Sequence, residues 1–590
     1  MVKMLRRSSS FIESLLTRVR NQMQQQGVSA FFLPHSDPHH NEYLSAHDMR
    51  MPFISGFSGS AGYMVITHEK ALLWTDSRYW LQAENELYPG WELMKITQDP
   101  PYYEWVIENL PANSVVGFDS SIVPAKSAKV RTEYFEKKGY TFKPVSNFVD
   151  QVWEERPLLS TEKVFVHELE YSGLSVEEKL GQVSEKMGEC RYLLVTALDE
   201  IAWVLNLRGN DVDYNPVFFA YLVVEKTNDQ VIPHLFINQE KIDSVREHLA
   251  SAKIREYSQI TEFLSAIEEK VSVNPNSCNL SLYNCIKNPF EQEDDITHIK
   301  ACKSQREIQG FKDSHIRDGL AICRYFSWLK NELLQNNSWN EYSGAQVLKD
   351  FRLASPVCKG PSFETISSVG PNAAVIHYRP DPETSSEITT KEIYLLDSGG
   401  HYLDGTTDTT RTVHFGEPTS FEKECYTRVL LGNLDLERMV WPKGMTGADL
   451  DVVARRRLWE KCLSYGHGTG HGVGYFLNVH EGPHGISRGR TLPLKEGMVT
   501  SNEPGYYEPH NFGIRIENMM YVAPKNEKFY CFENLTMVPY DKNLIDKTLL
   551  SQADLDYINE YHRKVHATLS PLIEDQVTQN WLDEATSPLE

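Results

Sequence analysis

Residues 393–415 read IYLLDSGGHYLDGTTDTTRTVHF. This pattern predicts an apolar strand that runs into Asp397, a turn-rich stretch, and a threonine-rich strand that returns with Asp408. A bent hairpin of this kind can bring both carboxylates to one place. Asp residues are also common in turns without any ligand, and Asp404 fits that explanation well. The hairpin alone therefore leaves a structural role open for both.

A second stretch, 465–484, reads YGHGTGHGVGYFLNVHEGPH. His467 and His471 are four residues apart, a spacing that helical zinc ligands also show. Four glycines within residues 468–474 oppose a helix by about 1 kcal/mol each, so we expect an extended chain. Alternate residues then share one face. A single histidine is more often structural than a ligand, but a third one, His480, follows in the same glycine-rich stretch and favours a functional site.

The third stretch, 499–519, reads VTSNEPGYYEPHNFGIRIENM. Glu503 is predicted at the end of an apolar strand, beside a Pro-Gly turn. Further along, apolar and charged residues alternate, which places Arg515 and Glu517 on one face of a half-buried strand. Two plainer explanations are a solvated outer face and a local Arg–Glu ion pair.

Taken together, these stretches offer four carboxylates and one imidazole. A mostly oxygen donor set suits Mn²⁺ best, with Zn²⁺ or Co²⁺ also possible. Converging carboxylates repel one another, and some would hold protons unless cations balance them. Two divalent ions can do so, and such a pair can share a bridging hydroxide and polarise a carbonyl. The candidate ligands are Asp397, Asp408, His471, Glu503 and Glu517.

The chain has 590 residues, which is too long for one hydrophobic core. Strand and helix patterns alternate in its first half, which predicts α/β architecture. The pattern breaks near 153–163 and again at the acidic segment 291–295. We therefore predict three domains, 1–153, 154–297 and 298–590. The third should open with a long amphipathic helix over about 303–334, continue with a strand-rich region over 362–541, and end in a polar helical tail after 550.

Composition excludes several classes of protein. The net charge of −22 disfavours nucleic-acid binding and a polybasic membrane-surface role. No run of 18 apolar residues occurs, so no spanning helix is predicted. Nine cysteines without a C-x-x-C pair indicate free thiols in a reducing compartment, hence the cytoplasm. The basic start could resemble a mitochondrial presequence, but a first helix around 11–19, capped by the preceding serines, is favoured.

These stretches resemble the aminopeptidase P family, which is related to methionine aminopeptidases, prolidases and creatinase. The matching segments are LLDSGGHYLDGTTDTTRT, HGTGHGVGYFLNVHEGP, EPGYY and GIRIEN, together with residues 360–380 and 54–83. The resemblance covers most of the chain and is strongest to the long, three-domain, eukaryotic cytosolic type. It implies two creatinase-like α/β domains, a following pita-bread metallopeptidase domain, a homodimer, and Mn²⁺ as the metal.

The resemblance also implies a role for each ligand. Asp397 would bind one metal, while Asp408 and Glu517 would bridge both. His471 and Glu503 would complete the shell of the second metal. Glu503 would in addition accept the proton of the attacking water.

Five further positions would serve the substrate. The resemblance implies that His377 and His480 contact the substrate and stabilise the reaction intermediate. The positions implied to line the substrate site are His467, Tyr507 and Arg515.

The predicted activity is release of the N-terminal residue from peptides that carry proline at the second position, by means of a metal-bridging hydroxide. One alternative is a prolidase, which cleaves only Xaa-Pro dipeptides. Prolidases usually lack the second N-terminal domain, so the 300 residues before the catalytic part favour the aminopeptidase. The other alternative is a non-catalytic pita-bread module that binds peptides, and the intact ligand set counts against it.

Overall fold

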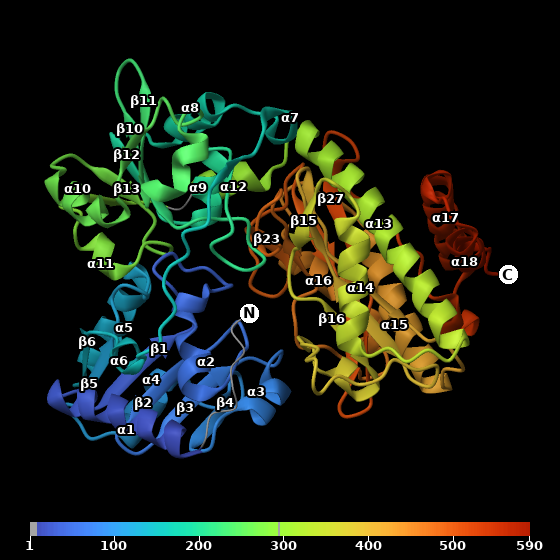
Figure 1. The fold of residues 1–590 in the computed structure, drawn as a ribbon, viewed down its shortest axis with the longest axis horizontal. Coiled ribbons are helices and arrows are strands. Elements are labelled where there is room, and N and C mark those ends of the chain that lie inside the picture. Colours follow the sequence, from blue (N-terminus) through green and yellow to red (C-terminus); the bar gives the residue numbers. More distant parts are fainter. Residues whose placement is uncertain (1–8, 293–294) are drawn as a thin grey trace. The chain divides into compact units, whose positions relative to one another are not determined.

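The computed structural model describes residues 9–292 and 295–590 (Figure 1). They form two compact units, one built from residues up to His167 together with Leu174–Ile296, the other from Glu168–Gly173 and Thr297–Glu590. All nine cysteines are free, as predicted. None of the helices within the described ranges is long and apolar enough to cross a membrane.

The first unit contains two six-stranded sheets with the same topology. Their strand orders are β4-β3-β2-β1-β5-β6 and β12-β11-β10-β8-β13-β14. In both, the central strand pairs antiparallel on one side and parallel on the other, and each outermost strand pairs parallel. The α/β architecture predicted for the first half of the chain, and the two α/β domains that the resemblance implied, are therefore confirmed. The strands are β1 Ala30–Pro34, β2 Tyr63–Thr67, β3 Ala71–Thr75, β4 Trp91–Lys95, β5 Val115–Phe118, β6 Thr141–Pro144, β8 Tyr192–Val195, β10 Ala220–Lys226, β11 Val231–Ile237, β12 Lys253–Arg255, β13 Val271–Val273 and β14 Pro289–Glu291.

Helices connect and flank these strands. The expected first helix is present as α1, Ser9–Gln25, and its apolar side is buried in the core of the first sheet. Its N-terminal cap and the basic residues 1–8 lie outside the described residues. The other helices of the unit are α2 Arg50–Ser55, α3 Trp80–Glu86, α4 Tyr102–Asn109, α5 Ala125–Lys137, α6 Phe148–Val152, α8 Val176–Lys186, α9 Leu198–Val204, α10 Ile260–Ala266 and α11 Leu280–Tyr283, and a small two-stranded sheet pairs β7 Phe165–Val166 with β9 Leu207–Arg208.

The second unit combines sheets with long helices. The predicted amphipathic helix is α13, Gln305–Leu334, and the reciprocal capping bonds between Ser304 and Glu307 fix where it begins. It packs along α14, and α17 packs against α18 (Figure 1). The helices of the unit are α7 Leu169–Ser172, α12 Asp295–Ala301, α13, α14 Glu341–Leu353, α15 Ser420–Glu437, α16 Gly447–Trp459, α17 Gln552–Leu569 and α18 Gln576–Thr586.

Four sheets carry the strands of this unit, in the orders β15-β18-β19, β16-β17-β20, β21-β28-β27-β24-β22-β23 and β25-β26. The region 362–541 is rich in strands, as predicted, but it also contains the helices α15 and α16, which the sequence analysis did not identify. Helix α15 is buried on nearly every side, so its sequence lacks the one-sided apolar period that identifies a surface helix. The strands are β15 Cys358–Pro361, β16 Ile366–Val369, β17 Tyr394–Ser398, β18 Gly400–Tyr402, β19 Gly405–Thr406, β20 Thr409–Val413, β21 Val440–Pro442, β22 Gly470–Gly472, β23 Glu481–Ile486, β24 Val499–Asn502, β25 Gly505–Glu508, β26 Phe512–Arg515, β27 Asn518–Pro524 and β28 Phe529–Asn534.

Candidate active site

The stretch 393–415 folds as the bent hairpin that its sequence predicts. Strand β17 pairs antiparallel with β20, and Asp397 lies opposite Thr410. Between them, β18 and β19 pair with each other in a different sheet. Asp408 directly precedes β20, so both carboxylates lie at the bend. Asp404 is instead paired with Arg317 of α13 and belongs to the packing of that helix.

The glycine-rich stretch around His471 is extended, as predicted. Gly472 pairs with Glu481 of β23 on one side and with Thr500 of β24 on the other. A Cβ at Gly470 would lie 2.1 Å from the Ser501 carbonyl oxygen, and one at Gly472 would lie 2.2 Å from that of Glu481. The glycines are therefore required by the close approach of neighbouring strands.

Glu503 and Glu517 lie next to each other at one end of the antiparallel pair β24–β27. The rung Asn502–Asn518 closes the β24–β27 ladder, and Glu503 follows β24 while Glu517 precedes β27. The strand before Glu517 is buried on both faces, because all four residues of β26 are buried. Arg515 is only 2% exposed. The expected half-buried strand and its solvated alternative were therefore both wrong, and packing against the α15 core explains why.

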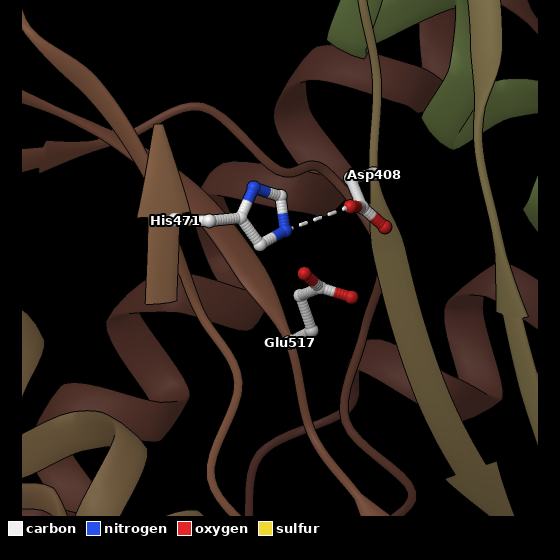
Figure 2. Close-up of side chains that lie close together, drawn as sticks. All are labelled: Asp408, His471 and Glu517. Carbon is white, nitrogen blue, oxygen red and sulfur yellow. Dashed lines mark ion pairs between the residues drawn. The ribbon is translucent and has the colours of Figure 1, made fainter. Parts of the chain in front are cut away.

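Three of the predicted ligands converge on one point. Asp408, His471 and Glu517 each offer a donor atom, and these atoms lie within 4.8 Å of one another (Figure 2). Nε2 of His471 lies 3.4 Å from Oδ2 of Asp408 and 3.5 Å from Oε1 of Glu503. Its Nδ1 lies 2.9 Å from the Gly472 carbonyl oxygen, which orients the ring so that Nε2 can serve as a metal ligand.

Asp397 borders this centre. Its Oδ2 accepts a hydrogen bond from Nη2 of Arg515 at 2.7 Å. Its Oδ1 is buried and has no hydrogen-bond partner within the described part of the chain. A buried carboxylate oxygen without a donor is costly, and a divalent cation would satisfy it.

The carboxylates repel one another strongly. Burial raises the pKa of Asp408 well above its usual range, and the charges of Asp397 and Glu503 raise it further. Burial likewise raises the pKa of Glu517, and the charges of Asp408 and Asp397 add to the effect. This confirms the expected repulsion. The oxygen-rich donor set, the buried Oδ1 of Asp397 and the mutual repulsion all fit divalent metal ions.

A hydrogen-bonded chain lies behind the carboxylates. Arg515 Nη1 donates to the Tyr507 hydroxyl at 2.7 Å, and this hydroxyl lies 2.8 Å from Nε2 of His467. The other side of His467 approaches Glu503, with Nδ1 3.8 Å from Oε2. The hydrogen-bonded chain therefore runs from Asp397 to His467, whose ring lies beside Glu503, and it contains the three side chains that the resemblance implied at the substrate site.

Of the remaining two histidines, His480 lies beside His471, and the backbone just before His377 contacts Arg515. The ring centroid of His480 is 4.4 Å from that of His471. For His377, the preceding carbonyl of Ile376 accepts a hydrogen bond from Arg515 at 3.4 Å.

Thr410 is a site residue that the sequence did not reveal. Its hydroxyl donates to Oε2 of Glu517 at 2.8 Å. The available signal was its position two residues after Asp408, because alternate residues of a strand share one face.

Models of known protein families match nearly the whole chain. The description "Creatinase/Prolidase N-terminal domain" matches residues 16–152 and 155–307. "Metallopeptidase family M24" matches residues 309–524, and the C-terminal region of the same family matches 528–589.

Two curated relatives and one solved structure are similar over their full length. An Xaa-Pro aminopeptidase 1 from Dictyostelium discoideum is 42% identical over 98% of this chain and 97% of its own. An Xaa-Pro aminopeptidase from Drosophila melanogaster is 42% identical over 98% of this chain and 99% of its own. The crystal structure of an X-prolyl aminopeptidase from Caenorhabditis elegans, described as a cytosolic enzyme with a di-nuclear active site, superposes with a TM-score of 0.94 at 34% identity and covers 98% of this chain and 100% of its own.

Proposed function

The chain belongs to the Xaa-Pro aminopeptidases of metallopeptidase family M24, and we propose that it releases the N-terminal residue from peptides with proline at the second position. The observation that carries the proposal is the convergence of Asp408, His471 and Glu517 in a chain that matches such enzymes from end to end. The full-length similarity, which includes both N-terminal domain matches, favours an aminopeptidase over a prolidase.

We assign the metal ligands as Asp397, Asp408, His471, Glu503 and Glu517. Asp408 and Glu517 are the most enclosed carboxylates of the set, and each has a donor atom within 4.8 Å of one on His471, so these three residues would hold metal together. Asp397 has one oxygen held by Arg515 and one available. When bound, two divalent ions would activate a water molecule and polarise the carbonyl of the first residue.

Glu503 is assigned as the general base. Its side chain is 18% exposed, whereas that of Asp408 is 6% exposed, so Glu503 is the more accessible to substrate. Ser501 Oγ donates to its Oε1 at 3.1 Å and orients it. Glu503 would take the proton of the attacking water and pass it to the leaving proline nitrogen, which must be protonated as the bond breaks.

The other site residues would bind and stabilise the substrate. We assign His377 and His480 as donors to the oxyanion of the tetrahedral intermediate. Tyr507 and His467 would form part of the substrate wall. The role of Arg515 in binding substrate stays a prediction, because its hydrogen bonds in the site are with Asp397, Thr410, Tyr507 and the Ile376 carbonyl.

Three finer properties belong to the same proposal. Mn²⁺ is the expected metal, because the donors are mostly oxygen. A cytoplasmic location is supported by the free cysteines and by the cytosolic description of the Caenorhabditis elegans enzyme. We also propose a homodimer, and no nucleic-acid or membrane partner, in line with the net charge of −22.

Comparing peptides of two lengths tests the activity. Purified protein loaded with Mn²⁺ should release the first residue from an Arg-Pro-Pro tripeptide, and metal analysis should find two ions per chain. Cleavage of Xaa-Pro dipeptides alone would identify a prolidase. Absence of both metal and cleavage would indicate a peptide-binding module without catalysis.

A further inference from the structure

Asn433 of helix α15 lies directly behind two of the assigned ligands. Its Nδ2 donates to the carbonyl oxygen of Asn502 at 2.8 Å and to that of Ile516 at 3.2 Å. Asn502 immediately precedes Glu503, and Ile516 immediately precedes Glu517. One buried amide group thus holds the backbone at both points where a metal-binding carboxylate begins.

The contact is reciprocal. Nδ2 of Asn502 donates back to the carbonyl oxygen of Asn433 at 2.9 Å. Both side chains are fully buried. Each also keeps a buried Oδ1 that finds no hydrogen-bond partner among the described residues. An unsatisfied buried acceptor costs free energy, so packing alone would favour an apolar side chain at these positions.

The two carbonyls lie in the short interval between two β-ladders that join the same pair of chains. Asn502 ends β24, which belongs to the six-stranded sheet, whereas Ile516 follows β26, which belongs to the β25–β26 pair. The ladder between β24 and β27 ends at the Asn502–Asn518 rung. Pairing resumes at the Gly505–Arg515 rung of β25 and β26. Between the two rungs, the backbone N–H of Ile516 donates to the Pro504 carbonyl oxygen at 3.3 Å, and the amide of Asn433 adds a second link between the chains that carry Glu503 and Glu517.

We propose that Asn433 is a positioning residue of the metal centre, which sets the separation between the carboxylates of Glu503 and Glu517. The proposal rests on the assignment of both as ligands. Asn433 touches neither carboxylate and acts only through the two carbonyls. Groups that orient metal ligands from behind typically contribute 10- to 100-fold to metal affinity.

The same helix supplies a matched control. Thr427 is as fully buried as Asn433 and also carries a hydrogen-bonding side chain. Its hydroxyl donates to the Lys423 carbonyl and accepts from the backbone of Asp546, and neither contact leads to a ligand. Thr427→Val therefore removes a buried polar group from α15 and leaves the metal centre alone.

The experiment titrates Co²⁺ into the metal-free full-length protein by calorimetry. Asn433→Leu keeps the side-chain volume but removes both donated bonds, and its Co²⁺ affinity should fall at least tenfold. The serine of Asn433→Ser is too short to reach both carbonyls but keeps one hydroxyl donor. This variant should therefore lose less Co²⁺ affinity than Asn433→Leu, in the same direction. Thr427→Val should leave the Co²⁺ affinity essentially unchanged, because neither of the contacts it removes leads to a ligand.

Each outcome decides a separate point. Unchanged Co²⁺ affinity in a folded Asn433→Leu variant would overturn the positioning role, and so would an equal loss in Thr427→Val. If Asn433→Leu does not fold, as judged by circular dichroism, Asn433→Ser decides by the same comparison. If the unsubstituted protein itself binds no Co²⁺, the proposed function fails, and the role of Asn433 fails with it.

Discussion

Replacing Glu481 with Gln tests whether a buried charge cluster beside the active site is essential. The Glu481 carboxylate accepts from Lys300 Nζ at 2.5 Å and is also paired with Lys303. All three side chains are at most 2% exposed. Glu481 follows His480 directly, and its backbone pairs with Gly472, the neighbour of His471. The cluster therefore adjoins both histidines.

The expected magnitude follows from charge and burial. Glu481→Gln leaves two buried ammonium groups that have lost their shared carboxylate, and breaking a buried ion pair in this way typically costs about 3–5 kcal/mol. Lys303→Met removes the surplus charge and leaves the one-to-one pair of Lys300 with Glu481. It should cost less, about 1–2 kcal/mol. Glu481→Gln should therefore be the more damaging of the two substitutions.

Scanning calorimetry measures the difference. A chain of this size does not unfold in a single step, so the relevant transition is the one that Mn²⁺ shifts upward. Glu481→Gln should lower its midpoint by about 5–10 °C, and Lys303→Met by about half as much or less. The reasoning is refuted if Lys303→Met is the more destabilising variant, or if Glu481→Gln leaves the midpoint unchanged.

Three further results are expected. Glu503→Gln should fold normally but lose at least about a hundredfold in turnover of Xaa-Pro-Xaa peptides, and retained turnover would remove Glu503 from its role as base. Chelation should abolish activity and Mn²⁺ should restore it best, whereas full activity in a demonstrably metal-free sample would contradict the mechanism. His39 accounts for part of the acid sensitivity: burial lowers its pKa from 6.5 to about 4, so the unfolded chain takes up a proton that the folded chain excludes. The free energy of unfolding should therefore fall by about 2 kcal/mol from pH 7 to pH 5, and thermal scans of His39→Gln at both pH values should show a smaller difference.

The sequence predicted the local form of the site well, because that form depends on neighbouring residues. The glycines around His471 excluded a helix through their cost in backbone entropy, and β22 is extended. Asp397 and Asp408 were placed at one bend because turn residues separate two short strands. Glu503 was placed at a strand end because Pro504 and Gly505 follow it.

What the sequence could not predict are the partners that compensate the buried charges. Arg515 was expected either to face solvent or to pair with a nearby glutamate, but its partner Asp397 is 118 residues away. Lys303 reaches Glu481 across 178 residues. The spacing of apolar residues indicates which face of a helix or strand is buried. It does not indicate which charged side chain from a distant part of the sequence packs against that face. Asn433 left no signal either, because α15 is buried on nearly every side and shows no one-sided apolar period.

The charges at the centre connect these points. Arg515 is the guanidinium that bonds Asp397, and it offsets one of four carboxylates. The rest of the negative charge still raises the pKa of Asp408 and Glu517. At neutral pH the fold can balance this charge by holding protons or by binding cations, and the buried Oδ1 of Asp397 has no donor within the described residues. Protonation would occupy carboxylate lone pairs that face His471, whereas divalent ions would be bound by those same lone pairs. Among the described residues, cationic side chains leave part of this negative charge unbalanced, and that remaining charge favours the binding of divalent ions.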